Sequence, residues 1–368
     1  MTSQRIQRLR EKLEQHKLDA CFIASPETAS PVNRRYLSGF TGTSAYLLIT
    51  QEDTVIATDF RYWEQAEREA AGFRLQRAVG SLEQWLPDLL VGLGGRRLAF
   101  EAAHVSYQSY RTVRKVVQEL PEAERPKLVA TTNLVEGLRV IKEPEEIAAL
   151  QAAVDLGDAA FQHVAERVEP GWTEKQVAWE IEKYIREHGG DGLSFDTIVG
   201  GGPWGALPHA QPRDHALKEG EGIVIDMGVR LDGYVSDLTR TIYLGKPDDQ
   251  FKRIYDIVLA AQQTATELVE AGMTGEQAHM LAHQVIEEAG HGDDFGHGLG
   301  HGVGLQVHEA PRLGKTSTDV LADGMVFTIE PGIYLTEWGG VRIEDMVVME
   351  NGRARVMSHA PKLTTAGV

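Results

Sequence analysis

The chain has 368 residues, enough for two domains, and its 42% hydrophobic and 25% charged residues are typical of a globular protein. The formal net charge of −17 argues against nucleic acid or an anionic membrane as a main partner, because both bind basic surfaces. A single cysteine, Cys21, excludes an intramolecular disulfide, and we find neither a signal-peptide core nor an apolar run near the ~20 residues that span a bilayer. We therefore expect a cytoplasmic protein.

Residues 1–133 predict an α/β domain. Ile6, Leu9 and Leu13 recur at helical spacing, and apolar strands and helices then alternate along the chain. The segment 119–127 holds two prolines and mixed charge, which indicates a boundary region, and 134–142 is expected to connect to a second domain. The expected strands are 19–25, 44–50, 54–59 and 97–100, and the expected helices are 62–71 and 107–119.

Residues 134–368 predict an α+β domain, because strands arranged as hairpins are set apart in sequence from helices. Pro144 suits the first turn of a helix over 144–168, and Thr173 suits the cap of a helix over 173–188. Further helices are expected at 248–271 and 275–289, and strands at 193–200, 223–231, 234–244, 325–333 and 341–349.

Two aspartates lie on either arm of a predicted hairpin. Asp232-Gly233 is a strong turn signal, and Asp226 and Asp237 are separated by an odd number of positions, which places them on one face. A four-residue loop would put them directly opposite each other, and a two-residue loop would put them diagonally. Two partly buried carboxylates on one face repel each other, so a shared proton or a cation must offset the charge.

Two glutamates repeat this pattern. Glu330 ends the apolar strand MVFTIE, and Glu344 lies inside VRIEDMVVM, where it shares a face with Arg342. Four acids within apolar strands predict a divalent-cation site.

Three histidines fall in the glycine-rich segment FGHGLGHGVGLQVHE, which is too flexible for a stable helix. A helical zinc pair is therefore a poor interpretation, whereas glycines let the backbone approach an ion or a substrate closely. We take His297, His301 and His308 as candidate site residues because they lie near the four acids in sequence. His209, in GGGPWGALPHAQP, is a weaker candidate.

Together these residues resemble the "pita-bread" peptidase family, which includes methionine aminopeptidase, aminopeptidase P, prolidase and creatinase. The segments DMG, SDLTRT, GHGLGHGVG, VHEAPR, TIEPGIY and GVRIEDMVV carry the resemblance over roughly the last 220 residues. NRRYLSGFTGT and DFRYWEQA resemble the creatinase-type N-terminal domain, which favours the proline-specific branch.

The resemblance implies two divalent metal ions, Mn²⁺ or Co²⁺ in first place and Zn²⁺ as a further candidate. It implies that Glu330 is also the general base, that His209 and His308 stabilise the scissile carbonyl, and that Asp237 and Glu344 bridge the ions. Substrate-binding roles are expected for Phe195, His297, Arg312 and Arg342, with Arg342 orienting a ligand. The implied metal ligands are Asp226, Asp237, His301, Glu330 and Glu344.

The implied activity is hydrolysis of the Xaa-Pro imide bond, in dipeptides or at the N-terminus of short peptides with proline second. Arg312 favours the dipeptidase slightly, because it suits the proline carboxylate. A creatinase-like, metal-free amidinohydrolase and a non-catalytic binding protein of the same fold are the alternatives, and the intact ligand set argues against both. The family also implies a homodimer.

Overall fold

The computed structural model describes residues 2–362 and 365–366 and divides into two compact units, Met1–Arg139 and Val140–Val368. Each unit contains its own buried apolar clusters. The expected boundary between residues 133 and 134 falls in the last segment of the first unit. In the part of the chain that is described, no helix combines the length and the apolar character needed to cross a membrane.

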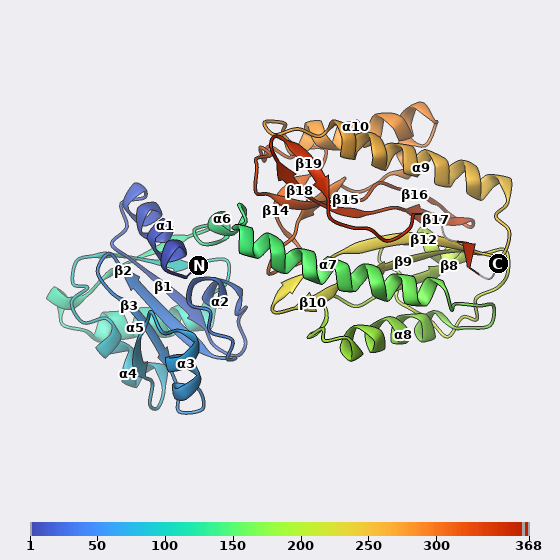
Figure 1. Ribbon diagram of the computed structural model, residues 1–368. Coiled ribbons are helices and arrows are strands. Elements are labelled where there is room, and N and C mark those ends of the chain that lie inside the picture. The colour runs from blue at the N-terminus through green and yellow to red at the C-terminus, as the bar shows by residue number, and fades with distance from the viewer. Residues whose placement is uncertain (1, 363–364, 367–368) are drawn as a thin grey trace. The chain divides into compact units, whose positions relative to one another are not determined.

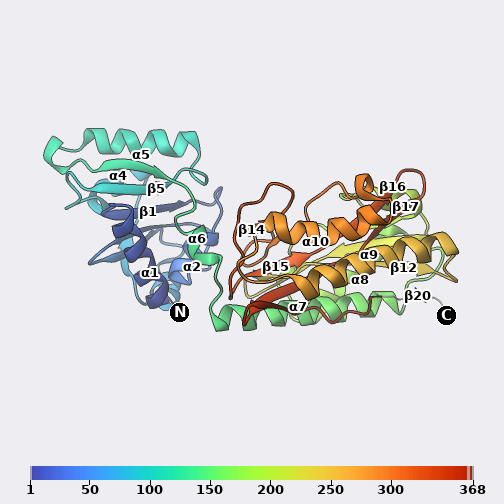
Figure 2. The same ribbon diagram turned by 90° about the horizontal axis from the view of Figure 1, so that it is seen from above.

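The first unit is a six-stranded sheet covered by helices, which confirms the α/β prediction. Its strand order is β4-β3-β2-β1-β5-β6. Figure 2 shows α5 along one face of this sheet and α1 along the other. The strands are β1 (Ala20–Ser25), β2 (Ala45–Thr50), β3 (Thr54–Thr58), β4 (Arg74–Arg77), β5 (Arg97–Glu101) and β6 (Lys127–Thr131), and the helices are α1 (Thr2–Gln15), α2 (Val32–Ser38), α3 (Trp63–Glu69), α4 (Leu82–Leu89), α5 (Tyr107–Glu119) and α6 (Glu136–Arg139).

The predicted boundary region at 119–127 is wrong. Strand β6 follows it and pairs in parallel with β5, so these residues form a connection inside the first unit. Pro121 lies between the end of α5 and a short 3-10 turn, and Pro126 directly precedes β6. The segment therefore has the composition of a linker although it lies within one domain. Helices α2, α4 and α6 and strands β4 and β6 were not expected from the sequence.

The second unit is α+β, as predicted. Helices α7 and α8 pack on a four-stranded sheet of order β20-β12-β9-β8, and α9 and α10 pack against a five-stranded sheet of order β14-β13-β15-β18-β19 (Figure 1). The helices are α7 (Pro144–Ala165), α8 (Glu174–Glu187), α9 (Asp249–Leu268) and α10 (Gly275–Glu288). The strands of the two sheets are β8 (Ile198–Gly201), β9 (Gly222–Met227), β12 (Leu238–Leu244), β13 (Gly300–Gly302), β14 (Glu309–Leu313), β15 (Val326–Ile329), β18 (Asp345–Glu350), β19 (Arg353–Val356) and β20 (Thr365–Ala366).

Each long strand predicted in this unit is interrupted. The short strands that result are β7 (Gly192–Leu193), β10 (Val229–Leu231), β11 (Tyr234–Val235), β16 (Gly332–Leu335) and β17 (Gly339–Arg342). Asp237, Glu330 and Glu344 lie in three of the interruptions, between β11 and β12, between β15 and β16, and between β17 and β18. A residue outside the strand ladder is free of strict alternation, so these acids can turn toward a common point.

The predicted hairpin turn is confirmed. Leu231 pairs with Tyr234, and the two intervening residues, Asp232 and Gly233, have φ angles of 47° and 76°. Positive φ at both positions is the geometry of a two-residue hairpin turn. In the same register Asp226 lies opposite Thr239, so Asp237 is diagonal to Asp226.

Candidate metal centre

The five predicted ligands come from five separate segments and meet at one place. Ligand atoms of Asp237, His301 and Glu344 all lie within 4.8 Å of one another. His301 Nε2 is 3.3 Å from a carboxylate oxygen of Glu330, and Asp226 is held beside them through Arg342. Both large sheets contribute, because Asp226 lies on β9 of the four-stranded sheet and His301 on β13 of the five-stranded sheet.

The glycines around His301 permit close packing of strands. A Cβ on Gly300 would lie 2.0 Å from Thr328 O, and a Cβ on Gly302 would lie 2.1 Å from Ala310 O. Any larger residue would therefore push β13 away from β15 or β14. The glycine-rich segment is a strand in this region, and its glycines allow neighbouring backbones to approach.

The orientation of His301 is set by its backbone surroundings. Its ring Nδ1 donates to Gly302 O at 3.2 Å, and its backbone N–H donates to Thr328 Oγ1 at 3.1 Å. Thr328 Oγ1 in turn donates to Glu330 at 3.1 Å. This arrangement leaves Nε2 facing the carboxylates, as a metal-binding imidazole requires.

Arg342 and Thr239 each occupy one oxygen of a predicted ligand. Arg342 Nη2 donates to Asp226 Oδ2 at 2.6 Å, and Thr239 Oγ1 donates to Glu344 Oε2 at 2.7 Å. The second oxygens, Asp226 Oδ1 and Glu344 Oε1, are buried and have no hydrogen-bond partner among the described residues. Buried carboxylate oxygens without partners are costly, and a divalent cation would satisfy both. The residues therefore fit a metal centre.

The electrostatics of the carboxylates are consistent with cation binding. Burial raises the pKa of Asp237 and of Glu344 well above the ordinary range, and the charges of neighbouring carboxylates raise it further. Burial also raises the pKa of Glu330, but the hydrogen bond and charge of His301 outweigh it and bring this pKa to about 2. Burial raises the pKa of Asp226 as well. Glu330 is therefore the readily ionised carboxylate of the four, and the other three resist ionisation unless positive charge is supplied.

The remaining predicted histidines lie around this cluster. The rings of His301 and His308 are 4.3 Å apart between centroids, and His308 is exposed. His297 Nε2 is hydrogen-bonded to Tyr334 OH at 2.8 Å. Burial lowers the pKa of His297 and of His308, and the exposed His209 is near enough to lower both further. The structure therefore brings all four predicted histidines together.

Phe195 and Arg312 lie at the edges of the same region. Phe195 is half-buried, and its ring would stand 2.9 Å from a Cβ on Gly228, two residues beyond Asp226. Arg312, on β14, is exposed and pairs in register with His301, so the two side chains share a face of the sheet.

Sequence reasoning missed three residues of the site. Tyr334 OH accepts from Arg342 Nη1 at 2.9 Å and contacts His297, while Thr239 and Thr328 hold the ligands described above. Each of them lies inside a segment that carried the family resemblance: Thr239 is in SDLTRT, and Thr328 and Tyr334 are in TIEPGIY. A chemical role was predicted for none of the three.

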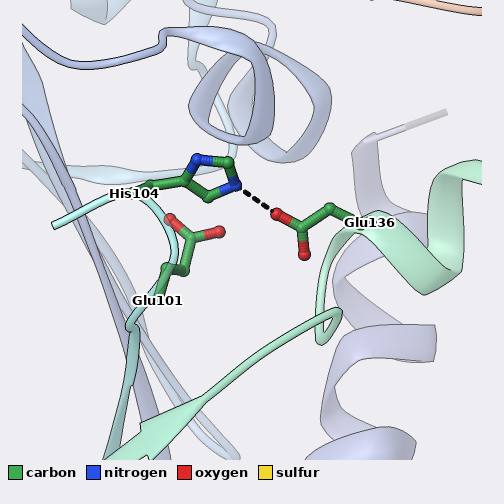
Figure 3. A group of neighbouring side chains, drawn as sticks. All are labelled: Glu101, His104 and Glu136. Carbon is green, nitrogen blue, oxygen red and sulfur yellow. Dashed lines mark hydrogen bonds and ion pairs between the residues drawn. The ribbon is translucent and has the colours of Figure 1, made fainter. Parts of the chain in front are cut away.

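A second group of metal-ligating side chains lies in the first unit. Figure 3 shows Glu101, His104 and Glu136 pointing toward one another, with His104 Nε2 2.5 Å from a Glu136 oxygen. Asn33 donates to both carboxylates at 2.5 and 2.6 Å and accepts from the buried Arg139 at 2.7 Å. Burial raises the pKa of Glu101 to about 7. Asn33 and His104 already provide hydrogen bonds to these carboxylates, so we assign no metal ion to this group.

The fold and the site define a metal-dependent peptidase with a separate N-terminal domain. The chain belongs to metallopeptidase family M24, whose family model matches residues 148–351. The model of the creatinase/prolidase N-terminal domain matches residues 5–141. The second unit is therefore a pita-bread catalytic domain and the first a creatinase-type domain, as the resemblance implied.

Relatives match over nearly their full length. Peptidase YqhT of Bacillus subtilis is 40% identical over 97% of this chain and 98% of its own. Among solved structures, an Xaa-Pro dipeptidase from Bacillus anthracis has a TM-score of 0.92 and 36% identity, with 100% of both chains covered. An X-Pro aminopeptidase from Thermotoga maritima has a TM-score of 0.89 and 32% identity, covering 98% of this chain and 99% of that one.

Proposed function

We propose that this protein is a dinuclear metallopeptidase that hydrolyses the Xaa-Pro imide bond, with dipeptides as its main substrates. The observation that carries the proposal is the convergence of five ligands, two of which present buried oxygens with no partner among the described residues. Xaa-Pro peptidases among the similar structures support the substrate class.

Two divalent cations would be held by Asp226, Asp237, His301, Glu330 and Glu344, with Asp237 and Glu344 shared between them. When bound, such cations would polarise the scissile carbonyl and lower the pKa of the attacking water. Four carboxylates balance the formal charge of two divalent ions. Oxygen ligands with one imidazole suit Mn²⁺ or Co²⁺, and Zn²⁺ is the further candidate.

The chain's own residues would perform the remaining steps. Glu330, ionised and 3.3 Å from His301, would accept the proton of the attacking water. His209 and His308, both exposed at the edge of the cluster, would stabilise the oxyanion that develops on the carbonyl. An imide before proline has no N–H, so the site need not supply an acceptor for one.

Arg312 supports the dipeptidase over the aminopeptidase. It is exposed on the face of β14 that it shares with His301, where its guanidinium could pair with the carboxylate of a C-terminal proline. Aminopeptidase activity is the second candidate, since one of the most similar structures is an X-Pro aminopeptidase.

The test is hydrolysis of an Xaa-Pro dipeptide and an Xaa-Pro-Xaa tripeptide, after chelation and after return of Mn²⁺, Co²⁺ or Zn²⁺. We expect metal-dependent cleavage, with the dipeptide preferred. Cleavage of the tripeptide alone would assign the aminopeptidase activity. Cleavage of neither with any metal would refute the proline specificity and reopen the creatinase-like and non-catalytic alternatives.

We also propose that the protein is a cytoplasmic homodimer. The dimer follows from the family resemblance, and the lone, fully buried Cys21 suits a reducing compartment. Light scattering at micromolar concentration should give twice the 40.6 kDa chain mass, and a monomeric mass would refute the dimer.

A further inference from the structure

Thr239 is the point at which hydrogen bonds from two site residues meet. Arg342 Nε donates to Thr239 Oγ1 at 3.0 Å, and Thr239 Oγ1 donates to Glu344 Oε2 at 2.7 Å. The side chain is fully buried on β12, directly opposite Asp226 in the β9–β12 register. Because Arg342 also donates to Asp226, the four residues form one continuous array.

The direction of each bond in this array follows from chemistry. A guanidinium Nε–H can only donate, so Thr239 Oγ1 must accept from Arg342. A hydroxyl has a single proton, which is then available for Glu344 Oε2, and that oxygen must act as an acceptor. Glu344 Oε1, buried and without a partner among the described residues, is left as the atom that can face a cation.

We propose that Thr239 is a positioning residue that decides which oxygen of Glu344 is presented to the metal centre. Its hydroxyl connects Arg342, which holds Asp226, to Glu344, so two predicted ligands that are far apart in sequence are held in one geometry. The inference rests on the proposed metal centre and adds to it a residue that touches neither metal nor substrate. Groups that orient metal ligands in this way typically contribute 10- to 100-fold to metal affinity.

The chain contains a matched control two residues along the same strand. Thr241 is also fully buried. Within the described residues its hydroxyl bonds only to the backbone of Arg342, donating to the carbonyl and accepting from the N–H, each at 3.0 Å. Replacing Thr241 with valine removes a buried hydroxyl without touching a ligand carboxylate. A general packing effect would affect both positions equally.

The experiment measures Mn²⁺ affinity of the full-length protein by calorimetry and by electron paramagnetic resonance of free Mn²⁺. We expect Thr239→Val to bind Mn²⁺ about 10- to 100-fold more weakly than the unmodified protein. Thr239→Ser, which keeps the hydroxyl, and Thr241→Val should stay within about threefold. If Thr239→Val does not fold, Thr239→Ala compared with Thr239→Ser isolates the hydroxyl in the same way.

Two results would overturn this inference alone: unchanged affinity in the folded variants that lack the Thr239 hydroxyl, or an equal loss in Thr241→Val. Failure of the unmodified protein to bind Mn²⁺, Co²⁺ or Zn²⁺ would instead overturn the metal centre itself, and the inference with it. The two failures are therefore distinguishable.

Discussion

Arg342 and Asp226, 116 positions apart in sequence, are joined by a hydrogen bond of 2.6 Å between Nη2 and Oδ2. The guanidinium is almost completely buried, and its Nε and Nη1 donate to Thr239 Oγ1 and Tyr334 OH. Asp226 is thereby held with one oxygen paired and the other free to bind a cation. This arrangement agrees with the expectation that Arg342 orients a ligand carboxylate.

Replacing Arg342 with methionine should weaken metal binding and lower kcat/KM for an Xaa-Pro dipeptide by about 10- to 100-fold. The change leaves Asp226 as a buried charge without its hydrogen-bond donor. Breaking a buried ion pair costs more free energy than breaking an exposed one. Arg355→Met is the control, because Arg355 pairs with Glu350 at the surface. Equal effects of the two substitutions would contradict the role given to Arg342.

His301→Ala and Asp237→Ala should each abolish activity while the protein still folds. Neither residue belongs to the buried apolar clusters, and each would remove a metal ligand. Activity assays with added metal, together with circular dichroism, check both parts of the expectation. His16→Ala, at an exposed position, should change neither, and full turnover in either ligand variant would refute the metal assignment.

Arg312→Ala should raise KM for an Xaa-Pro dipeptide by about tenfold, since a charge-assisted hydrogen bond is worth roughly 1.5–3 kcal/mol. An Xaa-Pro-Xaa tripeptide carries no carboxylate on its proline, so its KM should change little. The tripeptide is thus an internal control. An equal rise in KM for both substrates would show that Arg312 does not bind the proline carboxylate.

Gly300→Ala should destabilise the catalytic domain by about 1–3 kcal/mol, as overpacking typically does. The added methyl would meet Thr328 O at 2.0 Å, and the neighbouring backbone would have to move. At Gly296, in the same segment, nothing lies within 4 Å of a Cβ. In denaturant unfolding, Gly300→Ala should therefore have a lower free energy of unfolding than Gly296→Ala. Similar stabilities of the two variants would disprove the steric argument.

Glu101→Gln should stabilise the N-terminal domain at neutral and alkaline pH. Burial raises the folded-state pKa of Glu101 from 4.5 to about 7, so the folded state binds this proton more tightly than the unfolded state. The free energy of unfolding should accordingly fall by at most about 3 kcal/mol as pH rises from 4.5 to 7. Above pH 7 it should level off.

Glutamine keeps the oxygen that accepts from Asn33 but cannot ionise, so the variant should lose this part of the pH dependence. Hydrogen exchange of N-terminal-domain amides between pH 5 and 8 measures the difference, after correction for the intrinsic exchange rate. Glu119→Gln, at an exposed side chain, is the control. Equal pH dependence in the unmodified protein and Glu101→Gln would contradict the buried, proton-retaining carboxyl.

The sequence by itself determined the features that depend on near neighbours along the chain. The turn at Asp232-Gly233 requires positive φ at two adjacent residues, and the cap at Thr173 requires a side-chain acceptor within three residues of a donor. Alternation and helical spacing predicted the α/β and α+β classes for the same reason. The candidate ligand residues were also predicted from the sequence, because the motifs that contain them are local.

Tertiary structure alone decided how those ligands are held. The bonds of Thr239 to Arg342 and Glu344 join residues more than 100 positions apart, and no periodicity within one segment encodes such a pairing. The interruptions of the predicted strands, and the crowding that requires glycine at position 300, arise only when separate strands pack together. Local composition reports what a segment can form, whereas the contacts between segments determine where its side chains point.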